Sequence, residues 1–211
     1  MNLRWKIAQA AEIRWWQNYL RKKNKSEYLT WKKIYWERLL SNLNLKFSDN
    51  EKILDAGCGP TGIFMILDKY KTDALDPLVD DYEKKTTHFS RKEYPNVQFF
   101  CEPLEGFLPK EKYDKVFCLN AINHVADLDL CFDQIVDFTK EGGTLIVSID
   151  AHNYSFFKKI FQLLPGDILH PHQFDLEKKK KMMTDRGCKL EQSILSKEEF
   201  FFNHYILVCT K

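Results

Sequence analysis

The densest group of residues able to bind a ligand lies between Asp55 and Gly62, in the segment Asp-Ala-Gly-Cys-Gly-Pro-Thr-Gly. An apolar run ends at this segment and leads into a glycine-rich turn. Glycines at such a turn let a ligand approach the backbone closely, with amide groups directed at it. Asp76 ends the next apolar run, where a carboxylate accepts hydrogen bonds from ribose hydroxyls. The pattern predicts a nucleotide-like cofactor.

The spacing Gly57-x-Gly59-x-x-Gly62 also satisfies the fingerprint of dinucleotide-binding proteins, so the glycines alone leave NAD and S-adenosylmethionine open. Asp55 favours the second ligand. A carboxylate two residues before the first glycine repels a pyrophosphate but holds the cationic amino group of a methionine moiety, directly or through water. We interpret Cys58, inside the turn, as a small residue rather than a nucleophile.

Candidate bases follow the later apolar runs. His124 and His152 lie just beyond predicted strands, at the edge where doubly wound sheets bind ligands. Imidazole titrates near neutrality, so one of these two histidines is predicted to take a proton from an acceptor or to fix the acceptor's hydroxyl group. The residues assigned to acceptor binding beside them are Asp150, His170 and His172. A metal site built from these residues and His152 is the alternative, and it is disfavoured because His-x-His spacing is short and common. No motif accompanies His88 or His204.

The order of apolar runs predicts the elements that position these residues. Strands are expected near 52–56, 72–76, 97–101, 114–119 and 143–149, and helices near 61–70, 79–93 and 126–140. A helix near 176–186 and strands near 189–195 and 200–209 follow, the strands separated by residues 196–198. This predicts an α/β protein with a doubly wound, Rossmann-like sheet of about seven strands and a C-terminal reversed hairpin. The lysine run 178–181 is assigned to a solvated helix face.

All five tryptophans precede the first strand, in two predicted helices separated by the polar break 22–26. These helices either pack against the flank of the sheet or form a lid over a ligand, and both alternatives stay open. Trp16 and Tyr19 are assigned to an acceptor pocket. The expected organisation is a helical cap over 1–45 and a ligand-binding domain over 46–211, with an acceptor-side insertion at 151–173.

Composition narrows the class of protein. The formal net charge of the 211 residues is only +2, so no nucleic-acid partner is expected. Six scattered cysteines without a Cys-x-x-Cys pair indicate reduced thiols rather than disulfides or a zinc site. No stretch approaches the length of an apolar membrane span. We expect a cytoplasmic protein, monomeric or homodimeric.

Together the motifs resemble the Rossmann-like (class I) S-adenosylmethionine-dependent methyltransferases, over residues 52–211. The resemblance rests on the acidic residue before Gly-x-Gly, on Glu102-Pro103-Leu104 after the third strand, and on residues 113–120 as the fourth. Glu141 stands where this family usually has proline. The resemblance implies methylation of an oxygen or nitrogen of a small molecule, with S-adenosylhomocysteine as the product. The implied cofactor contacts are Asp55, Gly57, Cys58, Gly59, Asp76, Pro77, Glu102, Pro103, Leu104, Asn120 and Ala121.

Two other functions compete with this one. The literal glycine fingerprint is also that of an NAD(P)-dependent oxidoreductase, although Asp55 and the lack of a second substrate domain oppose it. The second competing function is that of a non-catalytic or RNA-binding protein that retains the fold. It is opposed by the presence of Asp55 and Asp76 and by the balanced charge.

Overall fold

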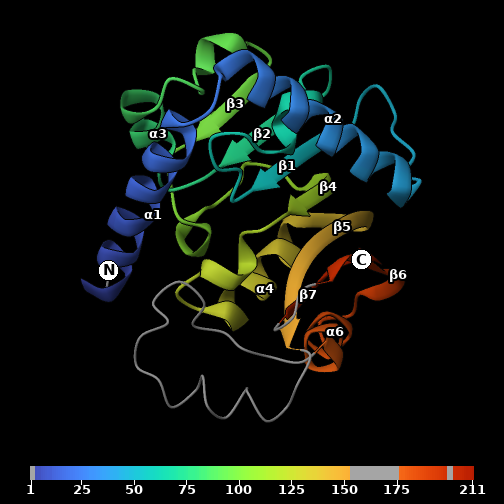
Figure 1. Ribbon diagram of the computed structural model, residues 1–211. Helices are drawn as coiled ribbons and strands as arrows, with labels where there is room; N and C mark the ends of the chain where they lie inside the picture. The colour runs from blue at the N-terminus through green and yellow to red at the C-terminus, as the bar shows by residue number, and fades with distance from the viewer. Residues whose placement is uncertain (1–2, 153–175, 199–201) are drawn as a thin grey trace. The chain divides into compact units, whose positions relative to one another are not determined.

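A computed structural model describes residues 3–152, 176–198 and 202–211 (Figure 1). The strands of the sheet follow the order β3-β2-β1-β4-β5-β7-β6. Parallel pairs join β1 with β2, β2 with β3 and β4 with β5, whereas β7 is antiparallel to both β5 and β6. The predicted Rossmann-like α/β fold with a reversed C-terminal hairpin is therefore confirmed. The chain forms two compact units, residues 1–107 and 108–211.

The first unit opens with two helices, and asparagines set both ends of the second. Asn24 caps the second helix by accepting a hydrogen bond from the amide of Glu27, and Asn44 ends it in the left-handed conformation. The elements of this unit, in chain order, are α1 (Leu3–Arg21), α2 (Lys25–Leu43), β1 (Lys52–Ala56), η1 (Ile63–Ile66), β2 (Lys71–Leu75), α3 (Val79–Lys85), η2 (Arg91–Glu93), β3 (Val97–Phe100) and η3 (Leu104–Gly106).

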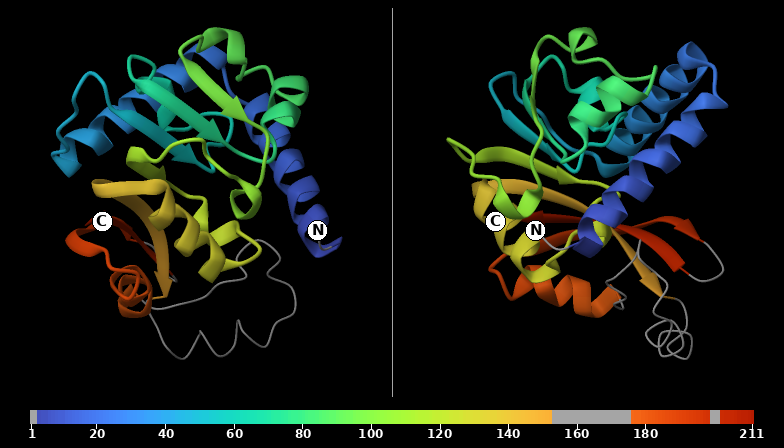
Figure 2. Two further views of the ribbon diagram at one scale, coloured as in Figure 1. Left: turned by 180° about the vertical axis from the view of Figure 1, so that it is seen from behind. Right: turned by 90° about the vertical axis from the view of Figure 1, so that its left-hand side faces the viewer.

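Both N-terminal helices belong to the core of the first unit. Ile13 and Leu20 of α1 and Trp36 of α2 are buried. The indole nitrogen of Trp36 also donates a hydrogen bond of 3.0 Å to the backbone oxygen of Thr61, which ties α2 to the glycine-rich turn. Figure 2 shows the two helices, in blue, running beside the strands of this unit. Each helix thus buries apolar side chains within the first unit, and a further role of α1 in ligand binding is not needed to explain this packing.

The helix predicted at 61–70 is wrong, because the chain forms only the short 3-10 helix η1 there. Ile63, Phe64 and Met65 are all buried, so the segment has no polar face and packing rather than helical period decides its conformation. The backbone oxygen of Leu67 then accepts a hydrogen bond from the Thr72 hydroxyl as the chain turns into β2. Similarly, the helix predicted at 79–93 ends at Lys85, where the Thr86 hydroxyl bonds to the Tyr82 carbonyl oxygen.

The second unit contains β4 (Tyr113–Cys118), η4 (Ile122–His124), α4 (Leu128–Phe138), β5 (Thr139–His152), α6 (Leu176–Thr184), β6 (Lys189–Glu198) and β7 (Phe202–Thr210). The N-terminus of α4 is capped by Asp127, whose carboxylate accepts a hydrogen bond from the amide of Leu130. In Figure 1, β5 lies beside β7. Buried apolar side chains of α4, α6 and the strands form the core of this unit.

Two strand boundaries differ from the prediction. β5 begins at Thr139 rather than near 143, and its early part is held by backbone hydrogen bonds that join Gly142 and Gly143 to Lys211. Residues 196–198, expected to separate the last two strands, belong to β6, where Lys197 lies opposite His204. Tertiary pairing across the hairpin thus extends strands that local sequence signals ended earlier.

All six cysteines are free thiols, and five of them are buried. Among the described residues, no helix is long and apolar enough to cross a membrane.

Candidate functional site

The glycine-rich turn of the first unit requires glycine for two different reasons. Gly57 and Gly59 have φ values of +74° and +56°, in the left-handed region that favours glycine. At Gly62 the reason is space, since a Cβ there would lie 2.4 Å from both a carboxylate oxygen of Asp55 and the carbonyl oxygen of Cys58. The amides of Gly57 and Cys58 donate to the Leu75 carbonyl oxygen at 2.7 and 3.0 Å, which fixes the turn at the end of β2.

Asp76, directly after β2, is held by the turn itself. Its carboxylate accepts hydrogen bonds from the amides of Gly59, at 2.9 Å, and Leu78, at 2.8 Å. Burial, with the nearby charge of Glu12 as a smaller cause, raises the pKa of Asp76 to about 7. The carboxylate is thus positioned against the glycine turn, where hydroxyl or cationic groups of a ligand would stabilise its charge.

Asp55, the one acidic residue of β1, is 2% exposed. Its Oδ2 accepts a hydrogen bond of 3.0 Å from the amide of Phe64, at the start of η1. Burial raises the pKa of Asp55 to about 7, against the opposing effect of backbone hydrogen bonds and the charge of Lys32. The ammonium group of Lys32 lies 4.5 Å from the centroid of the Trp36 ring, and burial lowers its pKa to about 8.

The sequence predicted a helix over 61–70, which would have placed a helix N-terminus beside the glycine turn. The short 3-10 helix η1 forms instead, and the carboxylates of Asp55 and Asp76 lie beside the turn. Asp55 and Asp76 both act electrostatically on Cys58, and burial, the larger cause, raises the pKa of that thiol well above its usual value. A thiol held protonated in this way is a poor nucleophile, which agrees with the interpretation of Cys58 as a small residue.

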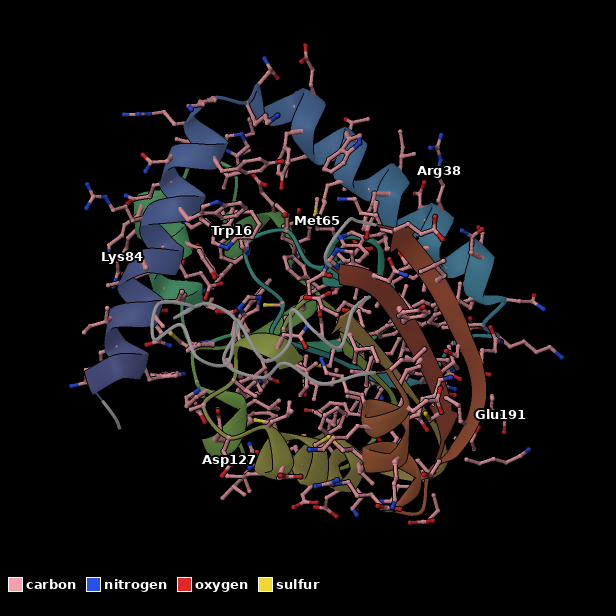
Figure 3. All side chains as sticks on the ribbon, turned by 60° about the horizontal axis from the view of Figure 1, so that its bottom comes forward. Trp16, Arg38, Met65, Lys84, Asp127 and Glu191 are labelled. Atoms are coloured by element: carbon pink, nitrogen blue, oxygen red, sulfur yellow. The ribbon has the colours of Figure 1, made fainter. Side chains whose placement is uncertain are left out.

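Trp16 of α1 lies over the glycine turn. A Cβ built on Gly59 would lie 3.8 Å from the Cζ2 atom of Trp16, and the Trp16 and Tyr82 rings meet edge to face with centroids 6.3 Å apart. Figure 3 shows the labelled Trp16 projecting from α1 toward the side of this unit where Met65 lies. Tyr19, assigned with Trp16 to an acceptor pocket, stacks on the exposed Trp15 with ring centroids 5.0 Å apart.

The remaining cofactor residues predicted in the first unit lie at the ends of β2 and β3. Pro77 accepts a hydrogen bond of 3.4 Å on its carbonyl oxygen from the thiol of Cys101. Pro103 precedes η3, with Leu104 buried and Glu102 exposed. The residue after β3, Cys101, thus contacts Pro77, which follows Asp76. No hydrogen bond among the described residues joins Glu102 to the glycine turn.

In the second unit, the segment after β4 is fastened to β5. Asn120 has a φ of +56°, and its amide donates a hydrogen bond of 2.5 Å to the Ser148 hydroxyl. Ala121 accepts a hydrogen bond on its carbonyl oxygen from the amide of His124, whose side chain is exposed on η4. His152 is the last residue of β5, and its side chain lies outside the described structure. His170 and His172 also lie outside the described residues.

Asp150 is the centre of a polar network that the sequence did not reveal. Its Oδ1 lies 2.5 Å from His204 Nδ1, and its Oδ2 accepts a hydrogen bond of 2.9 Å from the Asn123 side-chain amide. Lys179, which is fully buried, donates to Asn123 Oδ1 at 2.6 Å and to the backbone oxygen of Asp150 at 2.9 Å. Lys179 therefore contradicts the assignment of the lysine run to a solvated face.

A sequence signal for Lys179 exists. Leu176, Lys179 and Met183 recur at helical spacing, so Lys179 falls on the apolar face of α6. His204, by contrast, meets Asp150 only through the register of β5 with β7, which no local pattern specifies. Within the described residues, no group of three or more histidine, cysteine or acidic side chains is placed to hold a metal ion.

Comparison with known proteins adds a family match. A model described as a methyltransferase domain matches residues 47–186. The chain is 28% identical over 158 residues to a malonyl-[acyl-carrier protein] O-methyltransferase of Ilyobacter polytropus, covering 70% of this chain and 60% of that protein. It is also 28% identical over 116 residues to a ubiquinone biosynthesis O-methyltransferase of Rickettsia prowazekii, covering 53% of this chain and 46% of that one. The chain thus spans about 60% of the length of the two malonyl-[acyl-carrier protein] O-methyltransferases of Ilyobacter polytropus that it matches.

Solved structures give the same fold at lower identity. The magnesium protoporphyrin IX methyltransferase of Synechocystis, solved with S-adenosylhomocysteine, has a TM-score of 0.60 at 20% identity, covering 87% of this chain and 83% of that chain. A geranyl diphosphate C-methyltransferase of Streptomyces coelicolor, also with S-adenosylhomocysteine, has a TM-score of 0.64 at 13% identity, covering 84% and 78%. At such identities the likeness concerns the fold.

Proposed function

Since this chain belongs to the methyltransferase domain family, whose model matches residues 47–186, we propose that it transfers the methyl group of S-adenosylmethionine to an oxygen of a small-molecule acceptor. Family membership decides for S-adenosylmethionine and against the nicotinamide-dependent alternative. The choice of oxygen rests on the curated relatives, which are named as O-methyltransferases, whereas the solved neighbours include N- and C-methyltransferases.

One observation supports the cofactor assignment most directly, namely two buried carboxylates beside a turn that only glycine fits. Asp55 and Asp76 both have a pKa raised to about 7, chiefly by burial. A cationic amino group near Asp55 and ribose hydroxyls near Asp76 would stabilise the charged carboxylates, so the residues present fit the cofactor. Gly57 and Gly59 allow the backbone to approach it closely.

S-adenosylmethionine supplies an electrophilic methyl group on a positively charged sulfur. The tasks left to the chain are to align the acceptor oxygen with that methyl group, to exclude water and to remove a proton from the acceptor. In the first unit, Asp55 and Asp76 are proposed to hold the cofactor, and Trp16, over Gly59, to shield it from water. The assignments of Asn120 and Ala121 to the cofactor and of Asp150 to the acceptor, made from the sequence, stay predictions.

The test is a transfer assay with methyl-labelled S-adenosylmethionine and a small-molecule extract, separated from protein by ultrafiltration. The proposal predicts that label enters an extract compound as an O-methyl group. The Asp76→Ala variant should lose this transfer, and Asp81→Ala, on the exposed side of α3, should keep it. Label found only in a protein-bound product, or on nitrogen, would refute the proposed acceptor class while leaving the family assignment intact.

A further inference from the structure

Helix α1 is fastened to α3 and to the glycine turn by two residues one helical turn apart. The hydroxyl group of Tyr82, in α3, donates a hydrogen bond of 3.3 Å to Glu12 Oε1. Trp16 meets the same tyrosine ring edge to face and lies over Gly59. Residues four apart on a helix share a face, so Glu12 and Trp16 point to the same side of α1. This face of α1 is thus directed at the segment that follows β2.

Glu12 has little structural reason to be a carboxylate. The side chain is half-buried, and within the described residues its one hydrogen bond comes from Tyr82 and no cation pairs with it. A glutamine would accept the same hydrogen bond and bring no negative charge into the packed region. Packing of α1 against α3 therefore does not require an acidic residue at this position.

The charge of Glu12 acts on Asp76. Burial raises the pKa of Asp76 to about 7, and Glu12 is the next largest cause that raises it. Both carboxylate oxygens of Asp76 already accept a backbone amide, one from Gly59 and one from Leu78, so their orientation is fixed by the turn. Two carboxylates that repel each other thus serve the same side of the glycine turn. A ligand with two neighbouring hydrogen-bond donors would satisfy both.

On the basis of the proposed function, we propose that Glu12 is a second cofactor-binding carboxylate, which accepts a hydrogen bond from one ribose hydroxyl group of the cofactor while Asp76 accepts one from the other. A ribose carries two adjacent hydroxyl groups, and each donates one hydrogen. Hydrogen bonds to ionised acceptors are the strong ones, so the two contacts offset the repulsion between the carboxylates. Because Glu12 and Trp16 share a face of α1, the contact also holds α1 against the cofactor.

Isothermal titration calorimetry tests the contact without any acceptor. The ligands are S-adenosylhomocysteine and the two analogues of it that each lack one ribose hydroxyl group. Glu12→Gln should weaken S-adenosylhomocysteine binding about 3–10-fold, because a charged acceptor is replaced by a neutral one of the same shape. Wild type and this variant should bind equally the analogue that lacks the hydroxyl held by Glu12. The loss should persist with the other analogue.

Two matched variants complete the titrations. Asp76→Asn should show the opposite pattern, with its loss abolished by the analogue that keeps its affinity difference in Glu12→Gln. Glu37→Gln changes an exposed glutamate of α2 and should bind all three ligands as the wild type does.

Thermal unfolding of the ligand-free protein tests whether the two carboxylates act on each other. Without the charge of Glu12 the pKa of Asp76 should fall toward its ordinary value, so less stability is lost as pH rises through about 7. Glu12→Gln should therefore melt a few °C above wild type at pH 8 and at the wild-type temperature at pH 5. The other groups that interact with Asp76 stay in place in this variant, namely Asp55, Cys58 and Tyr82.

The outcomes separate this proposal from the proposed function. A folded Glu12→Gln protein that binds S-adenosylhomocysteine as tightly as wild type, or that loses the same affinity for all three ligands, overturns the role of Glu12 and leaves the proposed function standing. A ligand-free variant no more stable than wild type at pH 8 also overturns it, because the two carboxylates would then not share a site. Wild-type protein that binds none of the three ligands overturns both.

Discussion

Replacing Asp55 by Asn should stabilise the ligand-free protein and weaken its cofactor binding together. The pKa of Asp55 is raised from 3.8 to about 7, with burial as the main cause. Because the folded state keeps this proton to higher pH than the unfolded chain, the free energy of unfolding falls as pH rises from about 4 to about 7. At about 1.4 kcal/mol for each pH unit, the charged carboxylate costs the folded protein about 4 kcal/mol above neutrality.

Asparagine has the same shape and keeps an oxygen for the amide of Phe64, but it carries no charge. Thermal unfolding of the ligand-free Asp55→Asn variant at pH 8 should therefore give a melting temperature on the order of 10 °C above that of wild type, and less of a gain at pH 5. The substitution also removes the negative charge of Asp55, which stabilises protonated Lys32, and this loss reduces the gain in melting temperature. The stability of the variant still depends on pH, because the pKa of Asp76 is also raised to about 7. The exposed Asp81→Asn serves as the control. A variant no more stable than wild type at pH 8 would refute the account of Asp55 as a buried charge that requires a ligand cation.

Three further predictions concern the first unit. Gly62→Ala should lower the free energy of unfolding by about 1–3 kcal/mol or more in urea titrations, because its Cβ would lie 2.4 Å from two oxygens. Gly106→Ala, whose Cβ would lie no nearer than 3.9 Å to another residue, should change it little, and equal effects would contradict the argument. Trp16→Ala should weaken S-adenosylmethionine binding about 3–10-fold in calorimetry, whereas Trp15→Ala, at a residue that is 54% exposed, should not. Unchanged binding by the Trp16→Ala variant would contradict a role of Trp16 at the glycine turn. Mass spectrometry after brief alkylation of native protein should find Cys101 as the fast-reacting thiol, since it is the exposed one, and rapid labelling of the buried thiols would contradict the described packing.

Sequence reasoning recovered the strands and the glycine turn because both follow from local signals. β1 (Lys52–Ala56) is a short, largely apolar run ended by a turn with glycine at φ values that residues with side chains rarely adopt. Both features are local in the sequence. The helix predicted after this turn failed for the opposite reason. Its apolar run is continuous, so it carries no periodicity that distinguishes a helix from a buried irregular segment, and packing determined η1.

The polar network around Asp150 depends more on tertiary structure than the glycine turn does. Asp150 is assigned from its place after a strand, whereas no local motif points to His204, whose partner Asp150 lies 54 residues away along the chain. Lys179 was grouped with its neighbours in a charged run, although helical spacing places it on the apolar face of α6. Register between strands and the burial of one lysine among four are decided by packing, which a single sequence does not specify.

The roles of Asp55 and Asp76 in cofactor binding are tested most directly by isothermal titration calorimetry of the intact protein with S-adenosylmethionine, S-adenosylhomocysteine and NAD. We expect both adenosyl ligands to bind in the micromolar range and NAD to bind far more weakly. Asp76→Ala should reduce S-adenosylmethionine affinity about 10–100-fold, since hydrogen bonds to a charged group are worth about 1.5–3 kcal/mol. NAD binding as tight as that of S-adenosylmethionine, or an Asp76→Ala variant with unchanged affinity, would contradict the site described here.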